Sequence, residues 1–69
     1  PNPQVEILLA VSRVGKCRLE TESAKLLVEK YKTLFVVSLC SVKELCEVEG
    51  IGRKTAEGIL RTLGRELNV

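Results

Sequence analysis

The sequence predicts an all-α domain built from five short helices. The chain is rich in aliphatic residues, with eleven Leu, nine Val and three Ile beside a single Phe and a single Tyr, a composition that suits packed short helices. In most segments the apolar residues recur at intervals of three and four, which is the spacing of an amphipathic helix. Residues 34–40 could alternatively form a buried strand, but no second strand candidate exists to pair with them, so a helix is preferred.

The first two predicted helices are separated by a basic turn. Pro3 fits the first turn of a helix over residues 3–11. The apolar pattern stops between residues 12 and 18. Thr21 is expected to cap a second helix that ends near Lys32. The turn carries three cations and no acid: Arg13, Lys16 and Arg18.

Three more helices are expected in the second half of the chain. Residues 33–40 form a connector helix that is apolar nearly all round. Ser41 and Glu44 make a capping box, in which the Ser41 hydroxyl accepts from an unpaired backbone amide of the first helical turn and the Glu44 carboxylate accepts from the Ser41 amide. A fourth helix follows over residues 42–48. A fifth helix begins at about Arg53 and ends at about Arg65. Its inner face is expected to carry Ala56, Ile59, Leu60, Leu63 and Leu67.

The turn before the fifth helix is the most informative stretch. Glycines at alternate positions, Gly50 and Gly52, let the backbone adopt positive φ and lie close to a surface, while Ile51 plugs the gap between the helices. The amides that open the fifth helix favour an anion such as a nucleic-acid phosphate. Three polar residues beside them are candidate contacts: Arg53, Lys54 and Thr55. The alternative is a glycine-rich corner between helices that binds no ligand.

These residues are identified as the signature of the helix-hairpin-helix family of DNA-binding motifs. The basic turn resembles a degenerate first hairpin, in which Arg13 replaces the leading glycine and Val14 and Gly15 keep the apolar-Gly pair. Ala24 lies nine residues beyond Gly15, whereas Ala56 lies four beyond Gly52, so residues 17–21 look like an insertion.

Two hairpins joined by a connector resemble the tandem helix-hairpin-helix domain of the XPF nuclease superfamily, and most of all its non-catalytic excision-repair partner subunit. The resemblance divides a single domain, 1–69, into a degenerate first hairpin motif (1–32), a connector helix (33–40) and an intact second motif (41–67). It implies DNA binding without sequence specificity, directed by DNA structure, within a repair or recombination complex. The DNA-binding residues would be Gly50, Ile51, Gly52, Arg53, Lys54, Thr55, Arg13, Gly15 and Lys16.

The resemblance also implies a partner chain. A second helix-hairpin-helix domain, identical or different, would pair with this one, and the DNA would be a duplex, a single strand or a junction. The alternative function is mainly heterodimerisation with an XPF-like chain and little DNA affinity. Localisation would be nuclear in a eukaryote and cytoplasmic otherwise. The expected dimer interface consists of Phe35, Val36, Leu39 and Leu67.

The composition argues against several other classes of function. Histidine is absent and the three cysteines have no CxxC spacing, so we expect no metal site, no cofactor and no catalytic residues, although the chain could belong to a nuclease or helicase complex. No apolar run approaches the roughly 18 residues of a transmembrane helix, so no membrane partner is expected. The stability of so small a domain is marginal, which also favours a partner chain.

Overall fold

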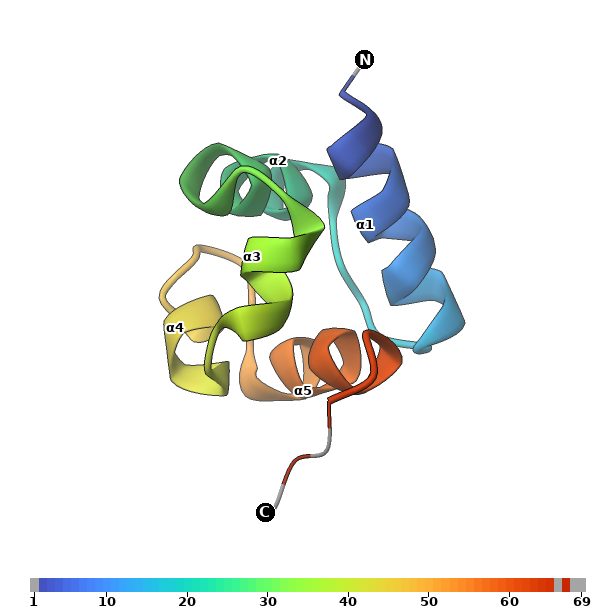
Figure 1. Cartoon of the computed structure of the whole chain (residues 1–69), viewed down its shortest axis with the longest axis vertical. Helices are drawn as coiled ribbons and strands as arrows, with labels where there is room; N and C mark the ends of the chain where they lie inside the picture. The colour runs from blue at the N-terminus through green and yellow to red at the C-terminus, as the bar shows by residue number, and fades with distance from the viewer. Residues whose placement is uncertain (1, 66, 68–69) are drawn as a thin grey trace.

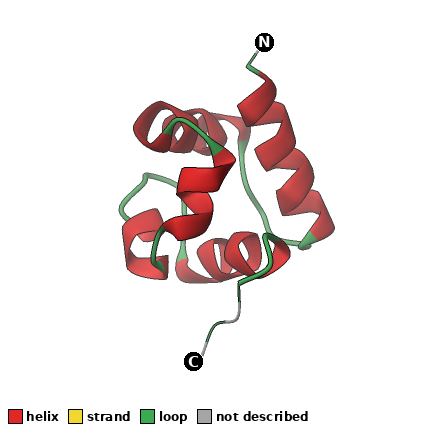
Figure 2. Cartoon of the chain, in the orientation of Figure 1, coloured by secondary structure: helices red, strands yellow, loops and turns green. Residues whose placement is uncertain are grey.

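A computed structural model of the chain describes residues 2–65 and 67, and within them the fold is all-helical, as predicted. The remaining positions of the predicted single domain, 1, 66, 68 and 69, lie outside the described residues. Figures 1 and 2 show short helices joined by loops around one core. The helices are α1 (Pro3–Val14), α2 (Thr21–Tyr31), α3 (Leu34–Leu39), α4 (Val42–Cys46) and α5 (Arg53–Thr62).

The core lies where α1, α2 and α5 meet, with α3 and α4 closing one side (Figure 1). α1 packs on both α2 and α5, α4 packs on α5, and α3 packs on α2. The core is aliphatic, as the composition predicts, since the largest fully buried side chains among the described residues are all Leu, Ile or Val. These side chains are Leu8, Leu27, Leu45, Ile59, Leu60 and Val37.

The helix α1 is longer than the sequence predicts. It runs through Val14 rather than stopping at residue 11, so the predicted basic turn begins three residues too early. The Ser12 side chain is buried and its hydroxyl donates to the Leu9 carbonyl oxygen at 2.6 Å, so this polar residue continues the helix instead of interrupting it. Gly15 follows as the C-cap.

The start of α2 and the ends of α4 and α5 also differ from prediction. Glu20 occupies the N-cap position and Thr21 is the first helical residue, so the predicted Thr21 cap is wrong. The helix α4 ends at Cys46 rather than residue 48, and α5 ends at Thr62 rather than Arg65. The chain leaves α5 through Gly64, whose φ of +98° stops the helix because that backbone conformation favours glycine.

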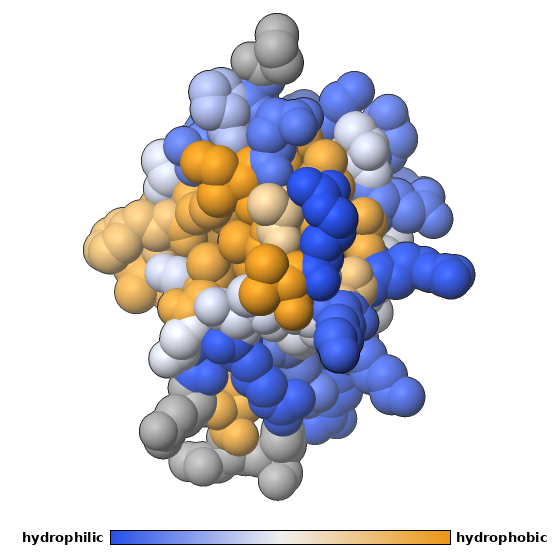
Figure 3. All heavy atoms as spheres, turned by 90° about the vertical axis from the view of Figure 1, so that its right-hand side faces the viewer, coloured by the Kyte–Doolittle hydropathy of each residue, from blue (hydrophilic) through white to orange (hydrophobic). Residues whose placement is uncertain are grey.

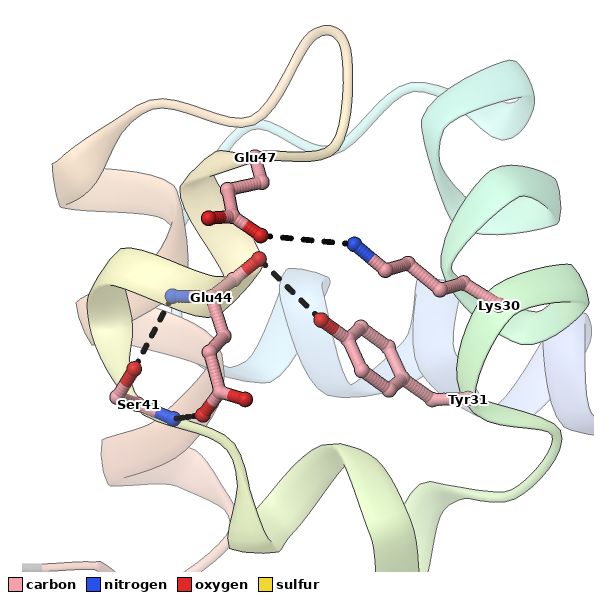
Figure 4. A network of polar contacts seen from close by, with 5 residues as sticks. All are labelled: Lys30, Tyr31, Ser41, Glu44 and Glu47. Carbon is pink, nitrogen blue, oxygen red and sulfur yellow. Dashed lines mark hydrogen bonds and ion pairs between the residues drawn. The ribbon is translucent and has the colours of Figure 1, made fainter.

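A polar network fixes α4 against α2 (Figure 4). The predicted capping box is present: Ser41 Oγ accepts from the Glu44 amide at 3.1 Å, and a Glu44 carboxylate oxygen accepts from the Ser41 amide at 2.9 Å. The hydrogen bond from the Ser41 amide to this carboxylate, followed by the interaction with the Ser41 side chain, lowers the pKa of the Glu44 carboxyl. Tyr31 donates from its hydroxyl to the Glu44 carbonyl oxygen at 3.3 Å, and Lys30 pairs with Glu47 at 3.6 Å. The network therefore sets the position from which the chain enters the turn before α5.

Candidate nucleic-acid interface

The glycine turn, Gly50 to Gly52, connects the end of α4 to α5. Gly50 has φ +88°, a conformation that a side chain disfavours, whereas Gly52 has φ −92° and serves as the N-cap of α5. The positive φ that the sequence predicts for the glycine turn therefore occurs at Gly50, and the same expectation for Gly52 is wrong. Ile51 is 5% exposed and belongs to the core cluster, and Ala56 is fully buried, so both fill the predicted places between helices.

The turn is held against the first residues of α2. Buried Ser23 donates from its hydroxyl to the Glu49 carbonyl oxygen at 3.0 Å. A Cβ atom on Gly50 would collide with the same hydroxyl, so glycine is required there for two reasons, backbone conformation and space. Gly52 is different, because a Cβ atom at that position would meet no described atom within 4 Å. The backbone at Gly52 is thus open to approach from solvent.

The first residues of α5 present cations beside these open amides. Arg53 and Lys54 are both exposed. Arg53 Nε donates to a Glu57 carboxylate oxygen at 3.1 Å, yet the Arg53 side chain remains 71% exposed, so its outer guanidinium nitrogens stay accessible. Glycine carries no side chain that could cap the first amides of α5. A helix start of this kind, with a positive macrodipole end and flanking cations, favours an anion.

The residues predicted from the first basic turn do not lie together on one exposed loop. Arg13 lies in the last turn of α1, and Lys16 is exposed with φ +55°. Gly15 packs against α5, where a Cβ atom on it would meet Thr62 Oγ1 and the Gly58 carbonyl oxygen. Gly15 therefore serves close packing of the chain in this structure.

The linker between α1 and α2, residues 15–20, runs beside α5 (Figure 1). Gly58 makes room for it, because a Cβ atom there would come within 2.9 Å of Cys17 Cβ and 3.1 Å of its sulfur. Farther along, Thr55 donates from its hydroxyl to the Arg18 carbonyl oxygen at 3.0 Å. Arg18, which the sequence prediction left out of the binding set, thus lies beside the start of α5.

The starts of α2 and α5 share one register, which means that equivalent positions in the two helices carry residues with the same role. The third residue of α2 is Ser23 and the third of α5 is Thr55, and each donates a side-chain hydrogen bond to the loop that leads into the other helix. The fourth residue is a fully buried alanine in both helices. Two buried apolar residues follow in each helix at the seventh and eighth positions: Leu27 and Val28, and Ile59 and Leu60.

This register corrects the predicted first hairpin. Leu19 lies two residues before the start of α2, just as Ile51 lies two residues before the start of α5, so the two positions are equivalent. Leu19 also packs against the core. Val14 is 75% exposed and plugs nothing, so the assignment of Val14 and Gly15 as the apolar-Gly pair is wrong. The predicted insertion between the turn and α2 is therefore wrong. The additional residues lie before Leu19, and the segment from Leu19 to α2 has the same length as the segment from Ile51 to α5. An alignment of Ala24 with Ala56 would have found this register.

Charge distinguishes the two helix starts. Three glutamates line a shallow depression with Gly50 at the start of α2: Glu20, Glu22 and Glu49. Their negative charge opposes an anion there. At the start of α5 the neighbouring charges are mainly positive, from Arg53, Lys54 and Arg18, with Glu57 paired to the first. The two ends of the fold share a register, but only the α5 end has the charge for a phosphate.

The comparison with known families agrees with this geometry. Residues 37–62 match the family model of the helix-hairpin-helix motif, a stretch that contains α4, the glycine turn and α5. The chain is therefore a small all-α domain with a helix-hairpin-helix motif, and this motif is generally associated with non-specific DNA binding. No curated protein and no solved structure gave a significant match to the chain.

The residues predicted for a dimer interface divide into two groups. Phe35 and Leu39 are 72% and 66% exposed, one turn apart on α3, and Val36 is also exposed. Leu67, by contrast, packs against the core of its own chain, so it is not a freely exposed anchor. Figure 3 shows, on the face where α1 lies, a further gathering of apolar side chains surrounded by hydrophilic ones.

Residues 2–65 and 67 contain no group of three or more His, Cys, Asp or Glu placed to hold a metal ion. Among the same residues, none forms part of a helix that is long and apolar enough to cross a membrane. Burial raises the pKa of the Cys17 and Cys40 thiols. The raised pKa disfavours the thiolate form of both cysteines at neutral pH.

Proposed function

We propose that this chain binds DNA through phosphate contacts at the start of α5, without reading the base sequence. The observation that carries the proposal is the open backbone at Gly52, followed directly by exposed Arg53 and Lys54. Backbone amides and flexible cations neutralise phosphates but carry no sequence information. The family match over residues 37–62 supports the same assignment.

The proposal predicts weak, salt-sensitive binding that depends on the two α5 cations. A handful of phosphate contacts gives a dissociation constant of roughly 10⁻⁴ to 10⁻⁶ M at physiological salt. Replacing Arg53 and Lys54 together by Ala is expected to weaken duplex binding roughly tenfold to a hundredfold at about 0.1 M salt and to lower the salt slope by about two units. Fluorescence anisotropy over a salt series measures both quantities.

The matched control removes the same charge elsewhere. Lys25 lies on α2 and Lys32 is its C-cap residue, and both are exposed. The Lys25→Ala, Lys32→Ala variant should lose much less affinity than the α5 variant. Equal losses in the two variants would mean that binding follows net charge alone, and no binding by the parent chain would refute the proposed function.

We further propose that the chain acts as a non-catalytic, structure-directed DNA-binding part of a repair or recombination complex, nuclear if its source is eukaryotic. Resemblance to the XPF superfamily is the support for this context. The absence of histidine from the sequence supports a non-catalytic role, because the usual general acid-base residue is missing. A panel of duplex, single-stranded and junction DNA compared at one salt concentration tests the structural preference.

A second candidate function is pairing with another helix-hairpin-helix domain through α3. Phe35 and Leu39 together form an exposed apolar patch on a helix whose other side, at Val37, is fully buried. Such a patch on so small a domain marks an interface.

Phe35→Glu is expected to abolish this association, because it sets a charge in the apolar contact. Analytical ultracentrifugation, with and without an XPF-like partner domain, measures it. Val14→Glu is the control, since it introduces the same charge at an exposed apolar residue on α1. A chain that stays monomeric at high micromolar concentration and captures no such partner would refute pairing.

A further inference from the structure

We propose that Thr55 is a positioning residue that holds the α1–α2 linker against α5, so that Arg18 extends the phosphate-binding surface of Arg53 and Lys54. This inference rests on the proposed function. It changes the role predicted for Thr55 from a direct phosphate contact to an internal one, and it adds Arg18 to the binding residues.

The contact that carries the inference joins residues 37 positions apart. Thr55 Oγ1 lies 3.0 Å from the Arg18 carbonyl oxygen, to which its hydroxyl donates. A threonine hydroxyl has one proton, and a phosphate oxygen can only accept. While Thr55 donates to Arg18, it therefore has no proton left for a phosphate. Its effect on binding must pass through the linker.

The charge along the linker makes its position important. Lys16 and Arg18 are exposed cations, and the first acid of the linker is Glu20, at the N-cap of α2. Thr55 holds the carbonyl group of Arg18 beside the third residue of α5, so the exposed Arg18 side chain starts next to Arg53 and Lys54. The cations of the first and second halves of the chain then form one basic surface.

The opposite side of the glycine turn has the reverse charge. There Ser23 makes the matching hydrogen bond to Glu49, but the surrounding side chains include Glu20 and Glu22. Phosphates crossing that side would meet carboxylates. A nucleic-acid strand that contacts the α5 amides is therefore directed over the linker side, toward Arg18, and away from Gly50.

The linker has a second, independent anchor, which makes the contact separable from folding. Gly15 and Cys17 pack against Gly58 and Thr62 near the other end of α5. Loss of the Thr55 hydroxyl should therefore release the Arg18 end of the linker while the packed end stays in place.

The experiment compares Thr55→Val, which keeps the shape and removes the hydroxyl, with Thr55→Ser, which keeps the hydroxyl. Thr55→Val is expected to weaken duplex binding by up to about tenfold at 0.1 M salt and to lower the salt slope by about one unit, the loss of one phosphate contact. Thr55→Ser should bind like the parent. Thr21→Val is the matched control, because Thr21 is exposed at the first position of α2 and the same change there leaves both anchors of the linker intact.

A double-mutant cycle separates positioning from direct contact. Arg18→Gln alone should lower the slope by about one unit, and Thr55→Val should add almost nothing in that background, because the cation it positions is already absent. Additive losses would overturn the inference in favour of a direct Thr55 contact. Parent-like binding by Arg18→Gln would also overturn it, and this outcome does not depend on how Thr55→Val folds.

The outcomes also separate this inference from the proposed function. Loss of binding in the Arg53→Ala, Lys54→Ala variant with parent-like binding by Thr55→Val and Arg18→Gln would remove the positioning role and keep the proposed function. A parent chain that binds no DNA would remove both.

Discussion

Gly50→Val is expected to lower the free energy of unfolding by about 2 to 6 kcal/mol. A β-branched residue at the φ of +88° found at Gly50 costs about 1 to 3 kcal/mol. The new Cβ atom would also collide with the Ser23 hydroxyl that holds the turn through Glu49, and overpacking of this kind costs a further 1 to 3 kcal/mol or so. For a domain of this size the sum is a large share of the total stability. Urea denaturation followed by circular dichroism measures the loss.

Gly52→Ser is the control for the Gly50 substitution. Gly52 has φ −92°, and a Cβ atom there meets no described neighbour within 4 Å, so the fold should tolerate a side chain. Serine is a preferred N-cap, and we expect stability to stay equal or rise by a few tenths of a kcal/mol. DNA binding should fall, because the new hydroxyl accepts from an amide that a phosphate would otherwise contact. Equal stability loss in the two variants would contradict the assigned turn geometry.

Gly58→Val is expected to cost about 1 to 3 kcal/mol, although glycine is the poorer helix former. Relative to Gly, Val gains only a few tenths of a kcal/mol in helix propensity. Against this gain, a Cβ atom at position 58 would come within 2.9 Å of Cys17 Cβ, closer than side chains pack, and the added methyl groups crowd the same contact. Either α5 or the linker must move. Thermal unfolding measures the loss.

The control for Gly58 is Arg61→Val on the same helix. Arg61 is exposed, so this substitution tests a valine in α5 without the contact to the linker, and only a small loss is expected. If Gly58→Val were as stable as Arg61→Val, the close approach of the linker to α5 would be contradicted. The Thr55 inference would then lose its second anchor.

Features set by neighbouring residues were predictable from the sequence. The capping box of Ser41 and Glu44 depends on residues three apart, and it is present with both hydrogen bonds. A positive φ in the glycine turn and the buried Ile51 were predicted as well, although the sequence did not say which of the two glycines would have the positive φ. The inner face of α5 was predicted at Ala56, Ile59 and Leu60 because helical spacing alone decides which side chains share a face.

Helix ends were predicted less well, since they depend on contacts outside the helix. The end of α1 is set where Gly15 packs against Thr62 and Gly58 of α5. Leu67 was assigned to a partner chain from the family resemblance, but it packs against the core of its own chain. A local pattern contains no information about which distant surface will meet such a residue.

The sequence by itself determined the five helices, the capping box and the glycine turn, because hydrogen bonds and dihedral preferences within a few residues are enough to specify each of them. Only the tertiary structure decided the composition of the candidate site. It sets Arg18 beside Thr55 across 37 residues and gives Gly15 a packing role. These relations arise from the packing of α1, α2 and α5 around one core, and spacing along the chain does not encode them.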